Sequence, residues 1–152
     1  MDDIDKKILS LLQINADIPV AELSKKVNLS STPCWLRINK LYKKGYIKKK
    51  VAVIDRVKIN LSTVAFVQIR TSQHNMAWSK KFIDGVKEMD EVVEFYRLSG
   101  TTDYLLKVLV PSIGKFDEFY KKLTDKIDLS DVTTSFAMEE IKQTSNLPLN
   151  YI

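Results

Sequence analysis

The sequence has one cysteine, one histidine and no long apolar run. Cys34 lacks a second cysteine for an internal disulfide bond, and together with His74 it provides too few ligands for a structural zinc site. No stretch approaches the roughly 18 to 20 apolar residues that a membrane helix needs. The chain also begins with acids, where a signal peptide has basic and then apolar residues. We therefore expect a cytoplasmic protein that holds no metal.

Combinations of residues that carry out catalysis are missing too. The sequence shows no paired nucleophile and base, no glycine-rich phosphate loop and no cluster of metal ligands. Cys34 stands near the start of a predicted helix, where a thiol can be reactive, but its place in an apolar stripe favours a buried structural role over redox sensing. The sequence predicts neither an enzyme nor a bound cofactor.

Positive charge is concentrated in the first part of the chain. Residues 1–60 carry 13 Lys/Arg and 6 Asp/Glu, a net charge of +7, whereas residues 61–152 carry 11 and 13, a net charge of −2. Between residues 25 and 58 there are 11 basic side chains and a single acid, Asp55. Such a local positive field suits a polyanion. Charge alone fits a solvated basic surface equally well.

Apolar residues at helical spacing predict three short helices in this basic part. The spacing that starts at Ile4 marks a first helix that ends near Asn15. A second helix is predicted over residues 19–27 and a third over residues 30–45. Because only a tight turn at Asn28 separates these two, the pattern predicts a helix-turn-helix whose third helix enters the major groove of double-stranded DNA.

The third helix has a buried and an outward face. Cys34, Ile38 and Leu41 recur at intervals of four and three residues, so they share the buried side. A β-rich run over residues 46–54 then contains three consecutive lysines and predicts a basic wing. The residues expected to contact DNA are Ser30, Ser31, Thr32, Pro33, Trp35, Leu36, Arg37, Asn39, Lys40, Lys43, Lys44, Lys48, Lys49 and Lys50.

These residues are expected to contact DNA in different ways. The lysines suit phosphates better than bases, because an ammonium is a point charge that positions a duplex without reading it. Arg37 fits a contact with a base or a phosphate. Its alternatives are a solvated cation and a partner for the end of another helix.

The second part of the chain alternates between strand and helix patterns. Strands are predicted over residues 63–71, 92–98, 104–110 and 132–141, and helices over residues 76–89 and 111–126. The order βαββαβ is that of the ferredoxin-like fold, an antiparallel sheet with two helices on one face. The sequence thus predicts an α+β protein with a winged helix-turn-helix over residues 1–54, a hinge over residues 55–61 and a ferredoxin-like domain over residues 62–152.

The other face of the predicted sheet has no cover. We expect apolar surface on it from Val93, Phe95, Leu106, Val108 and Phe136. Pairing with the same face of a second chain would bury that surface. The sequence therefore predicts a homodimer that forms through the second domain.

Five motifs occur in an order and spacing that are specific when taken together. They are Asp-x-x-Asp-x-x-Ile-Leu from Asp2, Glu-Leu-Ser-Lys-Lys-Val from Glu22, Thr-Pro-Cys from Thr32, Ser-Gly-Thr-Thr-Asp-Tyr from Ser99 and Met-Glu-Glu-Ile from Met138. With them, nearly the whole chain resembles the Lrp/AsnC family of bacterial and archaeal regulators. Within the family the likeness is greatest to the leucine-responsive members.

The resemblance implies a regulatory domain that responds to a small amino acid and dimers that assemble further into octamers. It also implies wrapping or bending of nucleoid DNA. In the family the effector lies between neighbouring regulatory domains, at a glycine-containing turn and a strand from another subunit. The matching residues here are Gly100, Thr101, Thr102, Asp103, Ser135, Phe136 and Ala137.

The physical chemistry of these residues is compatible with an amino acid. Gly100 permits close approach of the backbone, and Asp103 can pair with an ammonium group. Asp103 can equally order the turn by capping it. The chain departs from the family pattern at Thr101, where an acid is common, and at Ser135, where the leucine-responsive members carry an aromatic residue.

The functional expectation is a sequence-preferring, DNA-binding transcriptional regulator that responds to a small amino acid such as leucine. Its operator sequence cannot be taken from the family, because Trp35 and Leu36 are larger and more apolar than the usual outward residues of the DNA-reading helix. The alternative is an effector-independent, nucleoid-associated protein that wraps DNA.

Overall fold

The chain forms two compact units. The structure is a computed structural model that describes residues 1–73, 75–126, 129 and 131–152, so His74 lies outside the described residues. One unit combines Met1–Val53 with Lys142–Ile152, and the other is Ile54–Ile141. The sequence-based division keeps the last eleven residues with the second domain, whereas the structure groups them with the N-terminal helices.

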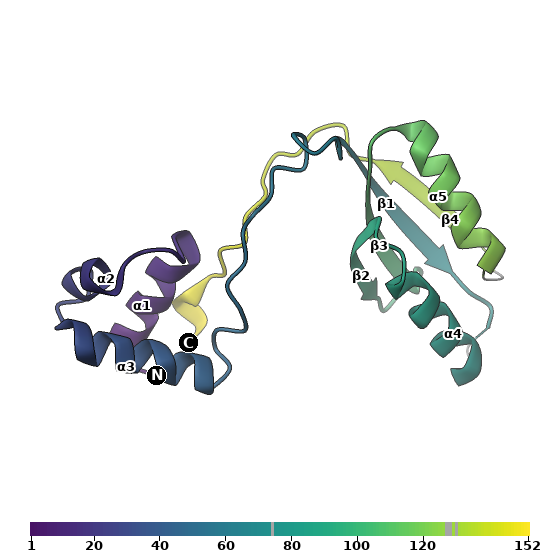
Figure 1. Cartoon of the computed structure of the whole chain (residues 1–152). Coiled ribbons are helices and arrows are strands. Elements are labelled where there is room, and N and C mark those ends of the chain that lie inside the picture. Colours follow the sequence, from purple (N-terminus) through teal and green to yellow (C-terminus); the bar gives the residue numbers. More distant parts are fainter. Residues whose placement is uncertain (74, 127–128, 130) are drawn as a thin grey trace. The chain divides into compact units, whose positions relative to one another are not determined.

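The N-terminal unit contains three α-helices: α1 (Asp3–Ile14), α2 (Val20–Lys26) and α3 (Ser31–Lys43) (Figure 1). Asp2 caps α1 by accepting a hydrogen bond from the Asp5 N–H. The exits of α2 and α3 each place one residue in the left-handed region, Asn28 at φ 57° and Gly45 at φ 76°. These two turns stop the helices where the sequence predicts.

A small apolar core holds the three helices together. Its fully or almost fully buried members come from all three helices and the turn that follows α2, and others pack around them. They are Ile8, Leu23, Val27, Cys34 and Leu41. The buried face predicted for α3 is confirmed by Cys34 and Leu41, and Ile38 packs against this core.

The segment after α3 differs from the prediction. Residues 46–54 form no strand, although the sequence predicts a β-rich wing there. A strand requires a neighbour to which its backbone groups can bond, and in the described part of the chain the only sheet is built from residues 63–136. The basic segment therefore has no regular secondary structure here.

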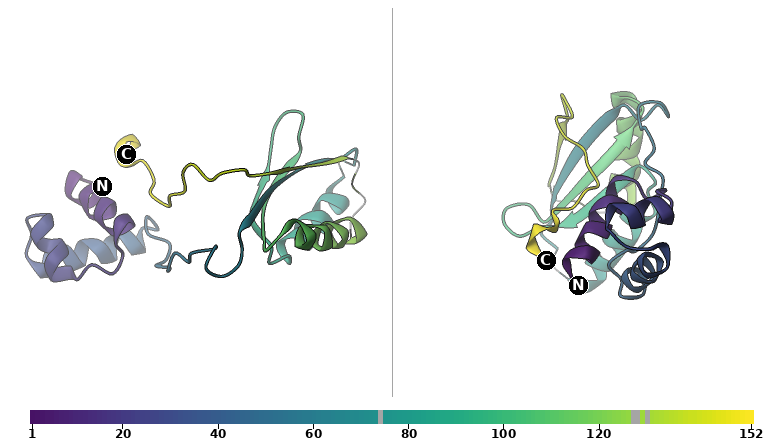
Figure 2. Two further views of the ribbon diagram at one scale, coloured as in Figure 1. Left: turned by 90° about the horizontal axis from the view of Figure 1, so that it is seen from above. Right: turned by 90° about the vertical axis from the view of Figure 1, so that its left-hand side faces the viewer.

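The second unit has the predicted βαββαβ order. Its elements are β1 (Thr63–Arg70), α4 (Met76–Lys87), β2 (Val92–Arg97), β3 (Tyr104–Val110), α5 (Ile113–Lys126) and β4 (Asp131–Phe136). The strands form an antiparallel sheet in the order β2-β3-β1-β4, and both helices cover one face of it (Figure 2). The ferredoxin-like prediction is confirmed.

Strand β4 is shorter than predicted. The sequence predicts it to continue to Ile141, but it ends at Phe136, and the last backbone bond on this edge runs from the Ala137 N–H to the Val64 carbonyl. Because β1 begins at Thr63, residues beyond Ala137 have no neighbouring strand on which to continue the ladder.

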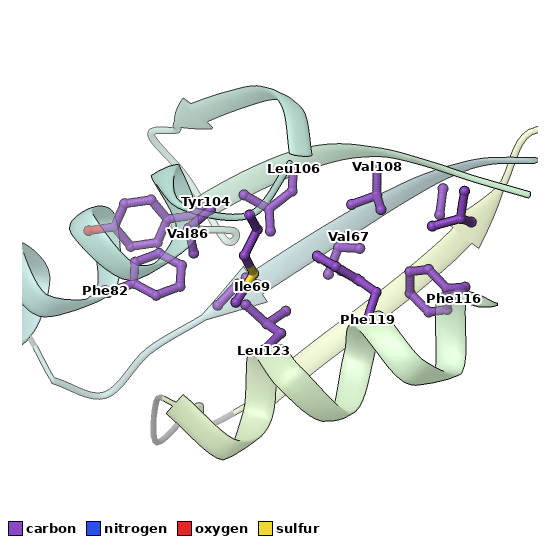
Figure 3. Packing of buried hydrophobic residues seen from close by; sticks show 13 residues of the cluster. Val67, Ile69, Phe82, Val86, Tyr104, Leu106, Val108, Phe116, Phe119 and Leu123 are labelled. Atoms are coloured by element: carbon purple, nitrogen blue, oxygen red, sulfur yellow. The ribbon is translucent and has the colours of Figure 1, made fainter. Parts of the chain in front are cut away.

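The core of this unit lies between the sheet and the two helices (Figure 3). Phe82 of α4 is completely buried, and its ring lies 5.1 Å from that of Trp78, 5.6 Å from Phe95 and 4.7 Å from Tyr104. Aromatic pairs at these separations add to the stabilisation that comes from burial itself. Phe82 is thus the central contact between α4 and the sheet.

The prediction of which residues occupy the open face of the sheet is wrong for four of five. Leu106 and Val108 are completely buried on the helix side, Phe95 contacts Phe82, and Phe136 contacts Phe116 of α5. Val93 is exposed, and Phe136 is also 36% exposed although its ring packs on the α5 side. The reason is the register, which sets Leu106 opposite Val67 and Val108 opposite Ala65, on the side covered by the helices.

The open face instead carries a different mixture of side chains. Phe66, Lys107 and Glu94 lie side by side across three strands, and the Lys107 Nζ donates to the Glu94 Oε1 at 2.9 Å. Leu105 and Leu109 occupy the same face of β3, where both are half-buried. The face is therefore apolar along part of β1 and β3, with an ion pair between β2 and β3.

Replacing Phe82 tests the assignment of the core. We expect Phe82→Ala to lower the free energy of unfolding of this unit by about 3–5 kcal/mol, because it removes a fully buried ring and leaves a cavity. Met76→Ala is the control on the same helix, since the Met76 side chain is exposed. Urea unfolding followed by Trp78 fluorescence measures both variants. Equal stability of the two variants would contradict the assignment.

Candidate functional site

Helix α3 presents most of the residues predicted to contact DNA. Those predicted on and just before the helix that are exposed are Ser30, Ser31, Thr32, Trp35, Leu36, Lys40, Lys43 and Lys44, while Pro33, Arg37 and Asn39 are half-buried. The three lysines at positions 48 to 50 are also exposed. Lys50 forms an ion pair within the protein, in which its Nζ lies 2.5 Å from the Asp17 Oδ1.

One open groove runs along the outward side of α3. It measures about 630 Å³ and is lined by side chains of this helix and of the turn that follows it. The lining residues are Trp35, Leu36, Asn39, Lys40, Lys43 and Lys44. An apolar pair thus lies toward the N-terminal half of the helix, and three cations lie toward its C-terminal end. No acid lines the groove, so its charge favours an anionic partner.

Arg37 lies away from this groove and bonds to the start of α1. Its Nη1 donates to the Asp2 Oδ2 at 2.6 Å and to the Asp5 Oδ1 at 2.7 Å. Asp5 is only 5% exposed, so Arg37 supplies a charged partner to a nearly buried side chain. The backbone hydrogen bond from Asp5 and the Arg37 guanidinium both lower the pKa of Asp2. Arg37 therefore has the helix-terminus role that the sequence left open.

Cys34 has the environment of a structural residue. Its side chain is completely buried in the core of the three helices, and burial raises the pKa of its thiol. A raised pKa leaves less of the reactive thiolate at neutral pH. This environment supports the structural role over redox sensing.

The last residues of the chain also contact α1. The Gln13 side chain donates from Nε2 to the Leu147 carbonyl at 3.2 Å and accepts from the Leu147 N–H at 2.9 Å. A short 3-10 helix, η1 (Leu149–Tyr151), follows. No residue pattern marks this contact in the sequence, because it joins positions 134 residues apart through a backbone group.

The glycine-containing turn of the second unit is ordered by Asp103. Its Oδ2 accepts from the Thr71 N–H at 2.8 Å, and its backbone N–H donates to the Ile69 carbonyl at 3.0 Å. Gly100 has φ 114°, which a side chain would strain. Thr101 is exposed and Thr102 is half-buried. Asp103 thus performs the turn-ordering role that the sequence allowed, and its Oδ1 is the carboxylate oxygen not used by Thr71.

The two predicted halves of the effector site lie at opposite ends of the sheet. The turn adjoins Ile69, whereas Phe136 is paired with Ala65 and Ala137 bonds to Val64. Four to five residues of β1 separate these positions, which corresponds to about 13–17 Å. Ser135 and Phe136 also point to opposite faces of β4, since Ser135 pairs with Phe66 on the open face. One chain alone does not bring the predicted effector residues together.

Within the described ranges, no three His, Cys, Asp or Glu side chains are grouped so that they could hold a metal ion. No described helix is long and apolar enough to cross a membrane.

A helix-turn-helix with a cationic outer groove, followed by a ferredoxin-like domain, defines a DNA-binding regulator. Residues 1–48 match the winged helix-turn-helix DNA-binding family, and residues 64–147 match the Lrp/AsnC ligand binding domain. The chain belongs to the Lrp/AsnC family of transcriptional regulators.

Relatives and solved structures agree over almost the full length. The glutamate uptake regulatory protein of Zymomonas mobilis is 48% identical, with 98% of this chain and 91% of the relative covered. The leucine-responsive regulatory protein of Escherichia coli is 32% identical, with 97% and 90% covered. The likeness predicted for the leucine-responsive members therefore exists, and other members share more of the sequence.

Two crystal structures have closely similar backbones. An AsnC family transcriptional regulator from Agrobacterium tumefaciens has a TM-score of 0.97 and 51% identity, with 100% of this chain and 99% of that chain covered. A complex of a Neisseria meningitidis transcriptional regulator with L-Met has a TM-score of 0.95 and 32% identity, with 99% and 98% covered.

The ion pairs of Arg37 lead to a test of its role. We expect Arg37→Ala to destabilise the N-terminal unit by about 1–3 kcal/mol, because it leaves the buried Asp5 without its partner. In an Asp5→Ala background the same change should cost less. Lys40→Ala is the control, since Lys40 is exposed on the same helix. Hydrogen exchange of α1 and α3 amides gives the measurement, and unchanged protection in Arg37→Ala would refute the structural role.

Proposed function

We propose that α3 binds in the major groove of double-stranded DNA, with the lysines of α3 and of residues 48–50 on the phosphates. The observation that carries this proposal is the groove on α3, which combines three lysines with Asn39 and an apolar pair. Asn39 offers an amide that can bond to a base edge. Arg37 acts as a positioning residue, because its ion pairs with Asp2 and Asp5 fix α3 against α1.

The second unit supports assembly into a homodimer through the open face of its sheet. Phe66, Leu105 and Leu109 leave apolar surface there that the helices do not cover. A second copy in two-fold symmetry would cover this face and present two copies of α3 to successive half-sites on DNA. Further assembly into octamers follows the family, as does association with the nucleoid.

A small amino acid is the effector that we propose for this dimer. The relatives' names refer to leucine and to glutamate uptake, and one structural neighbour holds L-Met. In our proposal the turn at residues 100–103 of one subunit and residues 135–137 of the other form each site. The 13–17 Å between these segments within one chain, measured along β1 at about 3.3 Å per residue, supports a shared site. The Asp103 Oδ1 would accept from the ammonium group of the effector.

Salt dependence distinguishes phosphate contacts from other contributions to binding. We expect the logarithm of the binding constant to fall linearly with the logarithm of salt concentration, and each lost phosphate contact to reduce the slope by about 0.9. Lys40→Ala and Lys43→Ala should therefore give shallower slopes. Lys121→Ala on α5 is the matched control. This exposed lysine lies in the second unit, not on α3, and forms an ion pair with Asp117.

Fluorescence anisotropy with a labelled duplex provides these slopes. Identical slopes for Lys40→Ala, Lys43→Ala and Lys121→Ala would contradict the placement of α3 on DNA. Equal affinity for genomic competitor DNA and for the protein's own promoter region would favour the alternative function, an effector-independent protein that wraps DNA.

Mixing two inactive variants tests the shared effector site. Calorimetry against the common amino acids first identifies the effector, and Thr101→Arg and Ser135→Arg should each abolish its binding by filling the site. In a 1:1 mixture of these two variants, random exchange of subunits restores about one quarter of the wild-type sites if two subunits form each site. A site within one chain would restore none.

Glu118→Arg provides the control for the added side chain, because Glu118 is exposed on α5. It should bind the effector as the wild type does. Sedimentation of each variant establishes that it still forms a dimer. No binding heat with any amino acid would contradict the proposed effector class.

A further inference from the structure

The outward side of α3 carries an apolar pair that the fold does not use. Trp35 is 54% exposed and Leu36 is 56% exposed, while their neighbour Cys34 is completely buried. Neither side chain belongs to the core of the three helices or to the residues packed around it. Exposed apolar side chains that are grouped on one surface indicate a contact with a partner.

The surroundings of this pair specify the chemistry of the partner. Trp35 and Leu36 share their groove, about 630 Å³ in volume, with Asn39 and with lysines that begin at Lys40. In helical spacing, Asn39 follows Trp35 by four residues and Lys40 follows Leu36 by four, so the apolar and polar side chains form one continuous stripe. A partner that fits this stripe has apolar groups beside hydrogen-bonding groups and negative charge.

The major groove of an A·T base pair has these properties. It presents the adenine N6 and N7, which an asparagine amide can bond in a bidentate manner, and the thymine 5-methyl group, which accepts apolar contacts. The phosphates along both edges of the groove supply the negative charge. Trp35 and Leu36 are the fifth and sixth residues of α3, in the part of a DNA-reading helix that contacts base edges.

We propose that Trp35 and Leu36 read thymine through its 5-methyl group, so that this regulator selects A·T base pairs by apolar contact. The inference rests on the proposed binding of α3 in the major groove. It assigns base selection to the two apolar side chains, with Asn39 on adenine, while the lysines bind phosphate without regard to sequence.

Removing only the methyl group provides the test. Full-length protein first enriches its preferred duplex from a random pool, and each thymine in that duplex is then replaced by uracil, which keeps the base pairing and the charge. We expect one or more replacements to weaken wild-type binding by about fourfold, the effect of losing one buried methyl-sized group. At those positions Leu36→Ala or Trp35→Ala should bind the thymine and uracil duplexes equally.

Lys40→Ala is the matched control, since it should weaken binding to both duplexes by the same factor and so keep the wild-type ratio. Equal wild-type affinity for the thymine and fully uracil-substituted duplexes would overturn the inference without any variant. A ratio that persists in both Leu36→Ala and Trp35→Ala would also overturn it. So would a change of oligomeric state in Trp35→Ala without DNA, because the pair would then contact another protein chain.

Failure of the underlying proposal gives a different result. If α3 did not bind in the major groove of DNA, one of two results would follow. Either no duplex would be enriched from the pool, or the enriched duplex would bind Lys40→Ala and Lys43→Ala as tightly as it binds the wild type. If α3 binds as proposed but reads other groups, a duplex is enriched and only the comparison of thymine with uracil fails.

Discussion

The register of the central strand β1 determines most of the second unit. β1 is bonded to β3 on one side and to β4 on the other, so a shift by one residue would turn its buried side chains to the opposite face. With the observed register, Ala65, Val67 and Ile69 face the helices, and Phe66 faces away. The same strand also sets the distance between the glycine-containing turn and the end of β4. The core, the open face and the proposed effector site therefore all depend on one alignment.

The N-terminal unit depends in a similar way on the rotation of α3 about its axis. Cys34 and Leu41 turn one side of the helix into the core, and the bonds from Arg37 to Asp2 and Asp5 join it to α1. Once these contacts are made, Trp35 and Leu36 must face outward. The apolar residues that read DNA in our proposal are therefore presented by the same packing that buries their neighbour in the chain.

Local signals in the sequence predicted the helices well, and pairings between distant residues were harder to predict. Asn28 and Gly45 end α2 and α3 as expected, because a left-handed residue acts within one turn of chain. The wrong face was assigned to Leu106 because alternation shows which residues of β3 share a side, and only the register with β1 shows which side the helices cover. The sequence alone did not decide between the alternative roles of Arg37, because its ion pairs join residues that are distant in the chain. The acids Asp2 and Asp5 at the start of a helix were nevertheless a signal for the helix-terminus role.

The grouping of Lys142–Ile152 with the helices has a topological consequence. The chain leaves the DNA-binding unit after Val53 and returns to it at Lys142, so both termini of the polypeptide belong to that unit. The regulatory unit is thus an insertion within the DNA-binding one, held by two polypeptide connections. A single proteolytic cut near residue 55 therefore leaves Lys142–Ile152 as the only part of the DNA-binding unit still covalently attached to the regulatory unit, and α1–α3 are then held to it by non-covalent contacts such as those of Gln13 with Leu147. A tag fused after Ile152 extends from the unit that carries α3.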